Sequence, residues 1–454
     1  MKAAALAGLT LMTCTAAAEP LTLEEAISRA LDHDPRIDEV VHLAEAARSW
    51  VDEARASGDL RVDLNTFVGL SPAVGGGLFE AGSCEAGSCR LRSDRYENHG
   101  ASVWLRFQLA LIKPLYTFGK IEHYAQAAEA NLAVKQEDIR LRRSRTALDV
   151  QRAYYGYLAA RDTRLLFTDV QKRLDAARDL TREWLDQGEG GVRQSDLYAL
   201  DAGAALVRRY LFQAEGLEHV ALASLKVLTG AAQDQPLEVA DSRLRPVPLP
   251  QQGLAELKQR ALQQRPEMAQ VAAGLTARRE LVAAKKADAR PSLYAGVAGL
   301  VSYSPNRDKV DNPHITDPFN DYGATPMVGL QWQWGHGVQA ARVARAEAEL
   351  NAMIAKAALA RQGIPYQVAE AYHQAAAGRQ AVAAMEDASR SARRWMIASF
   401  VDFEAGLEEA SKVVTAFQGY VLAHSDYLKT VYDYNMQVAQ LKRAIGADPL
   451  GEQR

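Results

Sequence analysis

The stretch ASVWLRFQLALIKPLYTFGK at residues 101–120 decides how the rest of the chain is interpreted. Within it, apolar side chains from Val103 to Leu111 alternate with Ser, Trp, Arg, Gln and Ala. A period of two is typical of a β-strand whose two faces meet different surroundings. The alternation ends near Pro114, and a long segment with helical spacing follows Lys120. The sequence therefore predicts a strand that leads directly into a helix.

Three more segments share this alternation, so that strands are predicted at about 60–71, 101–112, 292–303 and 325–335. Segments of this length and pattern are typical of outer-membrane barrel strands, with an apolar face toward lipid and a polar face toward the lumen. An ordinary half-buried sheet shows the same alternation. Two features favour the membrane: long polar loops follow the first strand of each pair, and aromatic residues stand at the strand ends near the helices. These aromatic residues are Tyr116, Phe118, Trp332 and Trp334.

Four strands are too few to enclose a lumen, because the smallest such barrels use about eight. Open sheet edges are not tolerated in lipid, since their backbone groups would lack hydrogen-bond partners. We therefore expect the chain to combine its strands with those of other copies, as a homo-oligomer.

The helical segments are unusually long. Residues 120–187 contain no proline and a single glycine, and their apolar side chains recur at spacings of three and four. This pattern predicts one helix on the order of 100 Å long. Residues 338–405 have the same role in the second half, with Pro365 in the middle. Such helices must pack side by side in an elongated bundle or tube.

The chain consists of two copies of one unit. Pro35 and Pro266 break the opening helix of each copy, and Tyr154 and Tyr372 occupy matching places in the long helices. We expect a first repeat at 19–230, with long helices at about 119–229, and a second repeat at 253–446, with long helices at about 337–445. An equatorial linker at 231–252 is expected to join the two repeats, and a C-terminal tail at 447–454 is expected to follow the second.

A basic residue, a short apolar run and an A-x-A site predict an export signal peptide at residues 1–18. The alternative is a lipobox in which Cys14 is lipidated. Cys84 and Cys89 end two tandem EAGSC pentapeptides, and export permits a disulfide between them. Metal binding by two thiols alone is the less favoured interpretation.

Composition excludes several classes of function. The net charge of −3 gives no reason to expect nucleic acid binding. The nine histidines are scattered, and no zinc-protease, P-loop or nucleophile-elbow motif is present, so we expect no catalytic residues, cofactor or metal site. Four loop acids are expected to lie in a solvated loop, with weak cation binding as the alternative: Asp308, Asp311, Asp317 and Asp321.

Three motifs together resemble the TolC-like outer-membrane efflux protein family: LTLEEA from Leu21, PLYTFGK from Pro114, and Val150 with Ala153-Tyr154. The resemblance covers nearly the whole mature chain. It implies a mainly α protein with a β-barrel part, in which duplicated long-helix hairpins form a trimeric periplasmic α-barrel. Four strands per chain would contribute to a 12-stranded barrel in the outer membrane of a Gram-negative cell.

The function implied by the resemblance is a passive exit duct of a tripartite efflux pump or a type I secretion system. The implied partners are two further copies of the chain, a periplasmic adaptor (membrane fusion) protein, an inner-membrane pump and outer-membrane lipid. In this family the periplasmic helix tips form the entrance and the adaptor-docking surface. The matching docking residues here are Gly190, Gly191, Ser195, Gly406 and Ser411.

Some relatives constrict the pore with aspartates just past the second tip. This chain has Lys412 and Thr415 at the matching positions, with Glu408, Glu409 and Asp196 nearby. We therefore expect any constriction to carry a different charge from an aspartate ring.

One alternative is a soluble periplasmic coiled-coil scaffold or pump adaptor with a small ordinary sheet. An adaptor would show one helical hairpin between β-rich modules, whereas this sequence has two hairpins with strands in each copy. A general diffusion porin needs many more strands than four.

Overall fold

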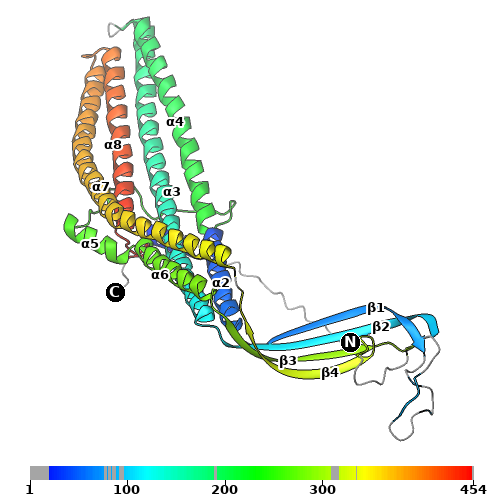
Figure 1. Ribbon diagram of the computed structural model, residues 1–454. Helices are drawn as coiled ribbons and strands as arrows, with labels where there is room; N and C mark the ends of the chain where they lie inside the picture. Colours follow the sequence, from blue (N-terminus) through cyan, green and yellow to red (C-terminus); the bar gives the residue numbers. More distant parts are fainter. Residues whose placement is uncertain are drawn as a thin grey trace, which may run out of the picture. The chain divides into compact units, whose positions relative to one another are not determined.

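The computed structural model describes residues 20–75, 79, 83, 88–91, 97–188, 192–307, 316–333 and 335–451. Along the chain, two helices, two strands and two helices follow one another, and the same order then repeats (Figure 1). The first copy comprises α1 (Leu23–His33), α2 (Pro35–Ala56), β1 (Arg61–Gly75), β2 (Glu97–Tyr116), α3 (Lys120–Gln187) and α4 (Gln194–Thr229). The second comprises α5 (Leu254–Gln264), α6 (Pro266–Ala287), β3 (Ser292–Tyr303), β4 (Asp321–Gln331), α7 (His336–Glu404) and α8 (Ala410–Ala444).

The breaks expected at the two prolines are present. Each proline is the first residue of its helix, where its missing N–H and fixed φ suit a helix start. Before Pro35, the Asp34 carboxylate accepts a hydrogen bond from the Arg36 backbone N–H at 3.0 Å and forms an ion pair with the Arg36 guanidinium at 2.8 Å. This side chain therefore caps α2.

The second copy keeps this joint with its charges reversed. Arg265 and Glu267 flank Pro266 and form an ion pair at 2.6 Å. In the first copy Arg36 also reaches Asp149 of α3 at 3.1 Å, and in the second copy Arg265 reaches Gln367 of α7 at 2.7 Å. Both copies thus have an ion pair between the two residues that flank the proline, which supports the duplication independently of apolar residue matches.

The chain divides into two compact units. The helical unit comprises Met1–Leu43, Lys135–Val271 and Lys356–Arg454, and the sheet unit comprises Ala44–Val134 and Ala272–Ala355. The long helices α3 and α7 contribute residues to both units.

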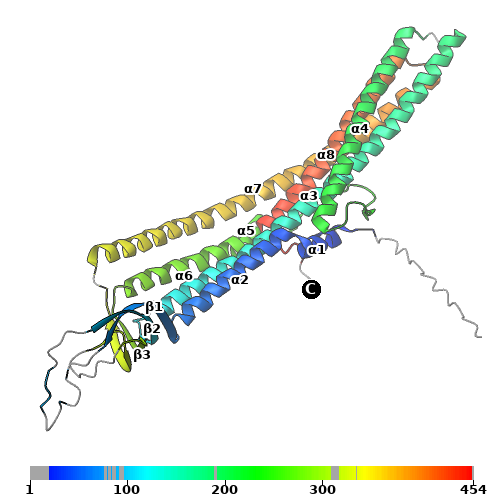
Figure 2. The same ribbon diagram turned by 90° about the vertical axis from the view of Figure 1, so that its right-hand side faces the viewer.

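Two hairpins, α3–α4 and α7–α8, build the long part of the helical unit (Figure 2). Their shared core contains one or more buried residues from each of the four helices: Phe167, Val170, Leu174, Leu200, Met396, Phe403, Val413 and Phe417. Buried residues recur at spacings of three and four along α4 and α8, as in coiled-coil packing. A second core joins α1 and the linker after α4 to α3 and α8, and Tyr154 is completely buried in it.

The sheet unit contains one antiparallel sheet in the order β1-β2-β3-β4. The register pairs Leu64 with Leu109 and Leu111 with Val297, so that apolar residues of neighbouring strands share a face. Shifts in register occur at Pro72 and Pro114, as expected for proline within a strand. The four predicted strands are confirmed.

Some predicted strand bounds were wrong. β2 is longer than predicted at both ends, and β4 begins earlier and ends at Gln331, so Trp332 lies beyond the strand. Trp334 lies outside the described residues. Strand ends depend on which backbone groups find partners across the sheet, and residue alternation does not report this.

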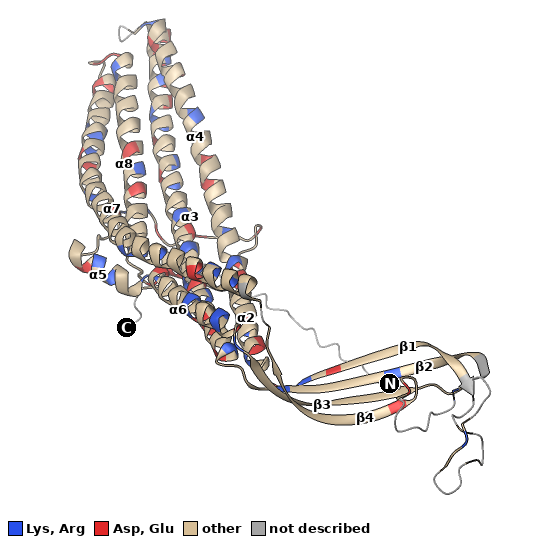
Figure 3. Ribbon diagram, in the orientation of Figure 1, with Lys and Arg blue, Asp and Glu red and all other residues tan. Residues whose placement is uncertain are grey.

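One face of the sheet is apolar and exposed. The exposed fraction is 63% for Leu64, 76% for Val68 and 72% for Val328. Figure 3 shows charged residues gathered on the helices and few along the strands. The edge strands of this sheet are β1 and β4.

Within the described residues, none of the helices combines the length and the apolar character needed to cross a membrane.

Candidate functional site

The candidate site consists of the two turns that close the hairpins. Gly188 follows α3 with φ of +70°, and Gly406 follows α7 with φ of +72°, a left-handed conformation that favours glycine. After α7, the Leu407 N–H donates to the Asp402 carbonyl at 2.8 Å and the Gly406 N–H donates to the Phe403 carbonyl at 2.9 Å. This pair of bonds is a Schellman motif, which terminates the helix and satisfies its last carbonyls.

Aromatic side chains pack against each other next to the two turns. Phe403 is completely buried, and its ring centroid lies 5.3 Å from that of Trp184 on α3. Because aromatic pairs of this kind add to the burial of apolar area, the last turns of both hairpins are held firmly.

Asp196 stabilises the first turn of α4 through hydrogen bonds with Arg193. Its Oδ2 accepts a hydrogen bond at 2.8 Å from the backbone N–H of Arg193, and its own N–H donates to the Arg193 carbonyl at 2.9 Å. A carboxylate that caps a helix in this way also interacts favourably with the helix dipole. Ser195, next to it, is exposed.

The other charged candidates lie together at the start of α8. Glu408 and Lys412 form an ion pair at 2.9 Å, in which Lys412 is largely exposed and Glu408 is half-buried. The hydrogen bond with Glu408 raises the pKa of Lys412 above its ordinary value.

Three further side chains continue this cluster. The Ser411 hydroxyl donates to Glu409 Oε2 at 3.4 Å, and the Thr415 hydroxyl donates to the Ser411 carbonyl at 2.9 Å. All three are exposed, whereas Ala410 and Val413, on the other side of the helix, are buried. The first turns of α8 thus expose a lysine and two hydroxyl groups, and the two glutamates lie just before the helix.

The structure brings together only part of the predicted set. Glu408, Glu409, Ser411, Lys412 and Thr415 form one cluster, and Gly406 shapes the turn just before it. Among the described residues, no hydrogen bond or ion pair joins Asp196 to this cluster. Gly190 and Gly191 lie outside the described residues.

Two exposed apolar residues at the turns were missed by sequence reasoning. Leu407 follows Gly406 and is 80% exposed, and Tyr198, the fifth residue of α4, is 64% exposed. The sequence signal that could have identified Leu407 is its position as the single large apolar residue in the stretch EAGLEEA. A large apolar side chain held in water at a rigid turn is a candidate contact for another protein.

Two other predictions concern cysteines and metals. Cys89 is disulfide-bonded, whereas Cys84 and Cys14 lie outside the described residues, so their pairing and lipidation stay predictions. The part of the chain that the structure describes holds no group of three or more His, Cys, Asp or Glu residues suited to a metal ion.

Residues 257–447 match the family model described as outer membrane efflux protein. This segment coincides with most of the second repeat. No curated protein matches the sequence.

Several solved outer-membrane proteins have a similar fold. The outer-membrane channel OprN is 16% identical over 94% of this chain and 90% of its own, with a TM-score of 0.74. The CmeC outer membrane channel of Campylobacter jejuni is 14% identical over 95% of this chain and 86% of its own, also at 0.74. The outer membrane protein VceC of Vibrio cholerae is 15% identical over 93% of this chain and 96% of its own, at 0.72.

The resemblance to the outer-membrane efflux protein family is therefore confirmed, and the chain has the fold of TolC-like outer-membrane channels. At these identities the likeness establishes the fold, while the sequence match of the second repeat supports an outer-membrane efflux duct.

Proposed function

We propose that three copies of the chain form the outer-membrane exit duct of a tripartite efflux pump or a type I secretion system. The observation that carries this proposal is the sheet, which has one exposed apolar face and two open edges. In a Gram-negative cell, β1 of one copy would pair with β4 of the next, and the twelve strands would close in the outer membrane.

The exposed face argues against a soluble scaffold. Soluble proteins rarely leave a contiguous apolar patch of more than a few hundred Å² uncovered. Here the exposed large apolar side chains continue from strand to strand on the same face of the sheet: Val62, Leu64, Val68, Leu70, Val103, Phe107, Leu109, Val297, Val301, Val328 and Leu330. Lipid contact accounts for all of them at once.

Helix α4 supports association of copies in the helical unit as well. Along one helix it exposes Leu206, Phe212, Leu217 and Val220, each by about half or more of its surface. Exposed apolar side chains on a long helix are the usual contacts with a neighbouring helix in a bundle. A second copy of this chain, side by side in a tunnel, would cover them.

The tip residues have two proposed roles. Lys412 and Thr415, with Glu408, Glu409 and Asp196, are proposed to line the periplasmic constriction, where Glu408 offsets the charge of Lys412. Ser195, Gly406 and Ser411, with Gly190 and Gly191, are proposed to contact the adaptor, and Leu407 adds an exposed apolar anchor.

The duct is tested by fractionation, followed by conductance measurements on detergent-extracted protein in planar bilayers. We expect recovery in the outer membrane, a trimer mass and discrete conductance steps. Recovery in the periplasm without detergent would refute the duct in favour of the soluble scaffold.

The constriction is tested with Lys412→Ala, for which Lys429→Ala is the matched control. Both lysines lie on α8 and pair with an acid four residues away, Lys429 with Asp433 at 2.6 Å. If the tip is the narrowest point, Lys412→Ala increases cation over anion permeability more than Lys429→Ala does. Equal shifts in reversal potential would contradict the placement of the constriction.

Docking is tested by cysteine crosslinking from Ser411→Cys to a co-expressed adaptor, because Ser411 is exposed beside the turn. A cysteine at Ser57, an exposed residue after α2, is the control. Crosslinking that is equal at both sites would count against docking at the tips.

A further inference from the structure

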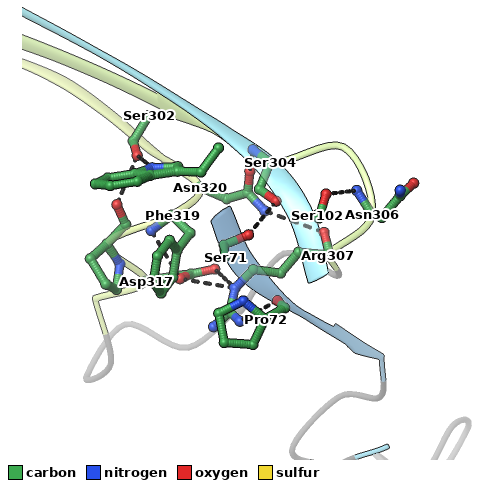
Figure 4. A network of polar contacts seen from close by, with 12 residues as sticks. Ser71, Pro72, Ser102, Ser302, Ser304, Asn306, Arg307, Asp317, Phe319 and Asn320 are labelled. Atoms are coloured by element: carbon green, nitrogen blue, oxygen red, sulfur yellow. Dashed lines mark hydrogen bonds and ion pairs between the residues drawn. The ribbon is translucent and has the colours of Figure 1, made fainter. Parts of the chain in front are cut away.

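The connection between β3 and β4 lies at the end of the sheet opposite the strand ends that lead to α6 and α7. We call residues 304–307 and 316–320 the flanks of this connection. Both flanks lie against the sheet rather than extending beyond it (Figure 4). The Asn306 N–H donates to the Ser102 hydroxyl of β2 at 3.2 Å, and the hydroxyls of Ser304 and Ser71 of β1 are 2.7 Å apart.

The flanks cover the polar face of the sheet. Ser71, Ser102 and Ser302 are buried, and the flanks provide hydrogen-bond partners for all three. Their strand neighbours Leu70 and Val103, which point to the opposite face, are 74% and 51% exposed. The apolar face is thus left free while the polar face is occupied.

Aromatic side chains hold the second flank. Trp104 of β2 lies over Gly69, where an added Cβ would come within 3.1 Å of the indole, and its Nε1–H donates to the Ser302 hydroxyl at 2.7 Å. The Phe319 ring packs edge-on against Trp104 with centroids 5.3 Å apart. The guanidinium of Arg307 lies 4.9 Å from the centroid of the Phe319 ring.

A buried ion pair joins the two flanks. Arg307 Nε lies 3.0 Å from an Asp317 oxygen, and the exposed fractions of the two side chains are 15% and 2%. Arg307 also donates to the Pro72 carbonyl of β1 at 3.2 Å, and Asp317 accepts from the Phe319 N–H at 3.1 Å. The expectation of a solvated acid was wrong for Asp317, because its charge is matched by a cation ten residues earlier in the chain.

We propose that the flanks form a constriction at the outer mouth of the channel and that the Arg307–Asp317 pair holds them over the lumen. This inference rests on the proposed function, because the polar face lines a lumen only when the strands close into a barrel. Three copies then bring three Trp104–Phe319–Arg307 stacks to one opening. The constriction selects by size which solutes pass between the lumen and the outside.

The test is the rate at which a lumen cysteine reacts with thiol reagents added outside the cell. Asn65→Cys, in a chain with Cys84 and Cys89 replaced by serine, places the thiol on the exposed part of the polar face of β1. It lies six residues before Ser71, about 20 Å deeper along the strand. The reaction rates of a small methanethiosulfonate and a bulky polyethylene glycol maleimide are compared. Because both reagents enter from outside the cell, a constriction at the periplasmic end of the duct does not affect these rates.

Asp317→Asn and Phe319→Ala are expected to raise the bulky reagent's rate by roughly tenfold or more, because breaking a buried pair or removing its aromatic support is strongly destabilising. The small reagent's rate stays unchanged. Asp63→Asn is the control, since it breaks an exposed pair with Arg61 at 2.8 Å at the other end of the same face. Trimer yield is followed for each variant, and Phe319→Ala keeps the test valid if the charge variant does not assemble.

Two negative results have different meanings. If assembled trimers of both variants react with the bulky reagent at the parent rate, the constriction is refuted and the duct remains. If the small reagent fails to reach Asn65→Cys in assembled parent protein and also in assembled Asp317→Asn and Phe319→Ala protein, the polar face does not line a lumen, and the proposed barrel is refuted together with the constriction.

Discussion

A pair of adjacent substitutions tests which face of β1 meets lipid. Leu64 and Asn65 are neighbours on one strand and point to opposite faces, and both are exposed in the single chain. Leu64 lies opposite Leu109, and Asn65 lies opposite Gln108. Leu64→Arg and Asn65→Arg therefore introduce the same side chain at the same depth, on the apolar face in one case and on the polar face in the other.

The expected difference follows from the position of Leu64 in the strand. At ~3.3 Å per residue and a tilt of about 40°, it lies near the middle of an apolar band about 25 Å tall. Arginine at the midplane of such a barrel costs about 2–4 kcal/mol. With three copies the trimer would lose about 6–12 kcal/mol. Asn65→Arg faces a water-filled lumen, so its cost should stay within about 0.5 kcal/mol per chain.

The assay is urea unfolding of the purified protein in lipid bilayers, together with trimer yield in the outer-membrane fraction. Leu64→Arg should lower both, and Asn65→Arg should lower neither. In a soluble scaffold both residues would be ordinary surface positions and the two variants would behave alike. Equal free energies of unfolding and equal yields would refute the assignment of the lipid face.

Three further predictions concern stability, measured by urea unfolding in detergent. Asp34→Ala should cost about 1–3 kcal/mol, since Arg36 loses one of its two carboxylate partners and α2 loses its cap. Burial would raise the pKa of Asp34, but its hydrogen bonds lower it, so this contribution to stability is present above about pH 4 and is lost as the pH falls. A stability of the unmodified protein that does not decline in this pH range would contradict the role of Asp34. Gly406→Ala should lower the free energy of unfolding by about 1–2 kcal/mol, because Gly406 has φ of +72°. Gly363→Ala is the control and should not destabilise, since Gly363 lies within α7 with open space around it. Equal effects of the two substitutions would argue against backbone strain at Gly406. Burial lowers the pKa of His424, so stability should decline as the pH falls below about 6.5, and His424→Gln should remove that decline.

The long helices could be predicted from the sequence almost to the residue. The segment 120–187 coincides with α3, because a helix this long needs only a continuous apolar spacing and the absence of interior breakers. The breaks at Pro35 and Pro266 are equally local, since proline at the first helical position is favoured by its own geometry. The tip cluster was partly predictable for the same reason: Glu408 and Lys412 are four residues apart on one helix.

The burial of Asp317 could not be predicted, although its sequence neighbours were known. Its partner Arg307 and the aromatic support from Trp104 depend on how the flanks meet the sheet. Leu407 illustrates the reverse case, because the apolar residue after the glycine of a Schellman motif often packs back onto its helix, whereas Leu407 is exposed.

The sequence by itself determined the duplication, the long helices and the alternation of the four strands, because each is a periodic property of neighbouring residues. Only the tertiary structure decided the strand bounds, the exposure of one sheet face and the occupation of the other by the flanks. These depend on contacts such as Ser71 with Ser304, which join positions 233 residues apart. Local spacing carries no information about such contacts, since they form only when the strands have found their register.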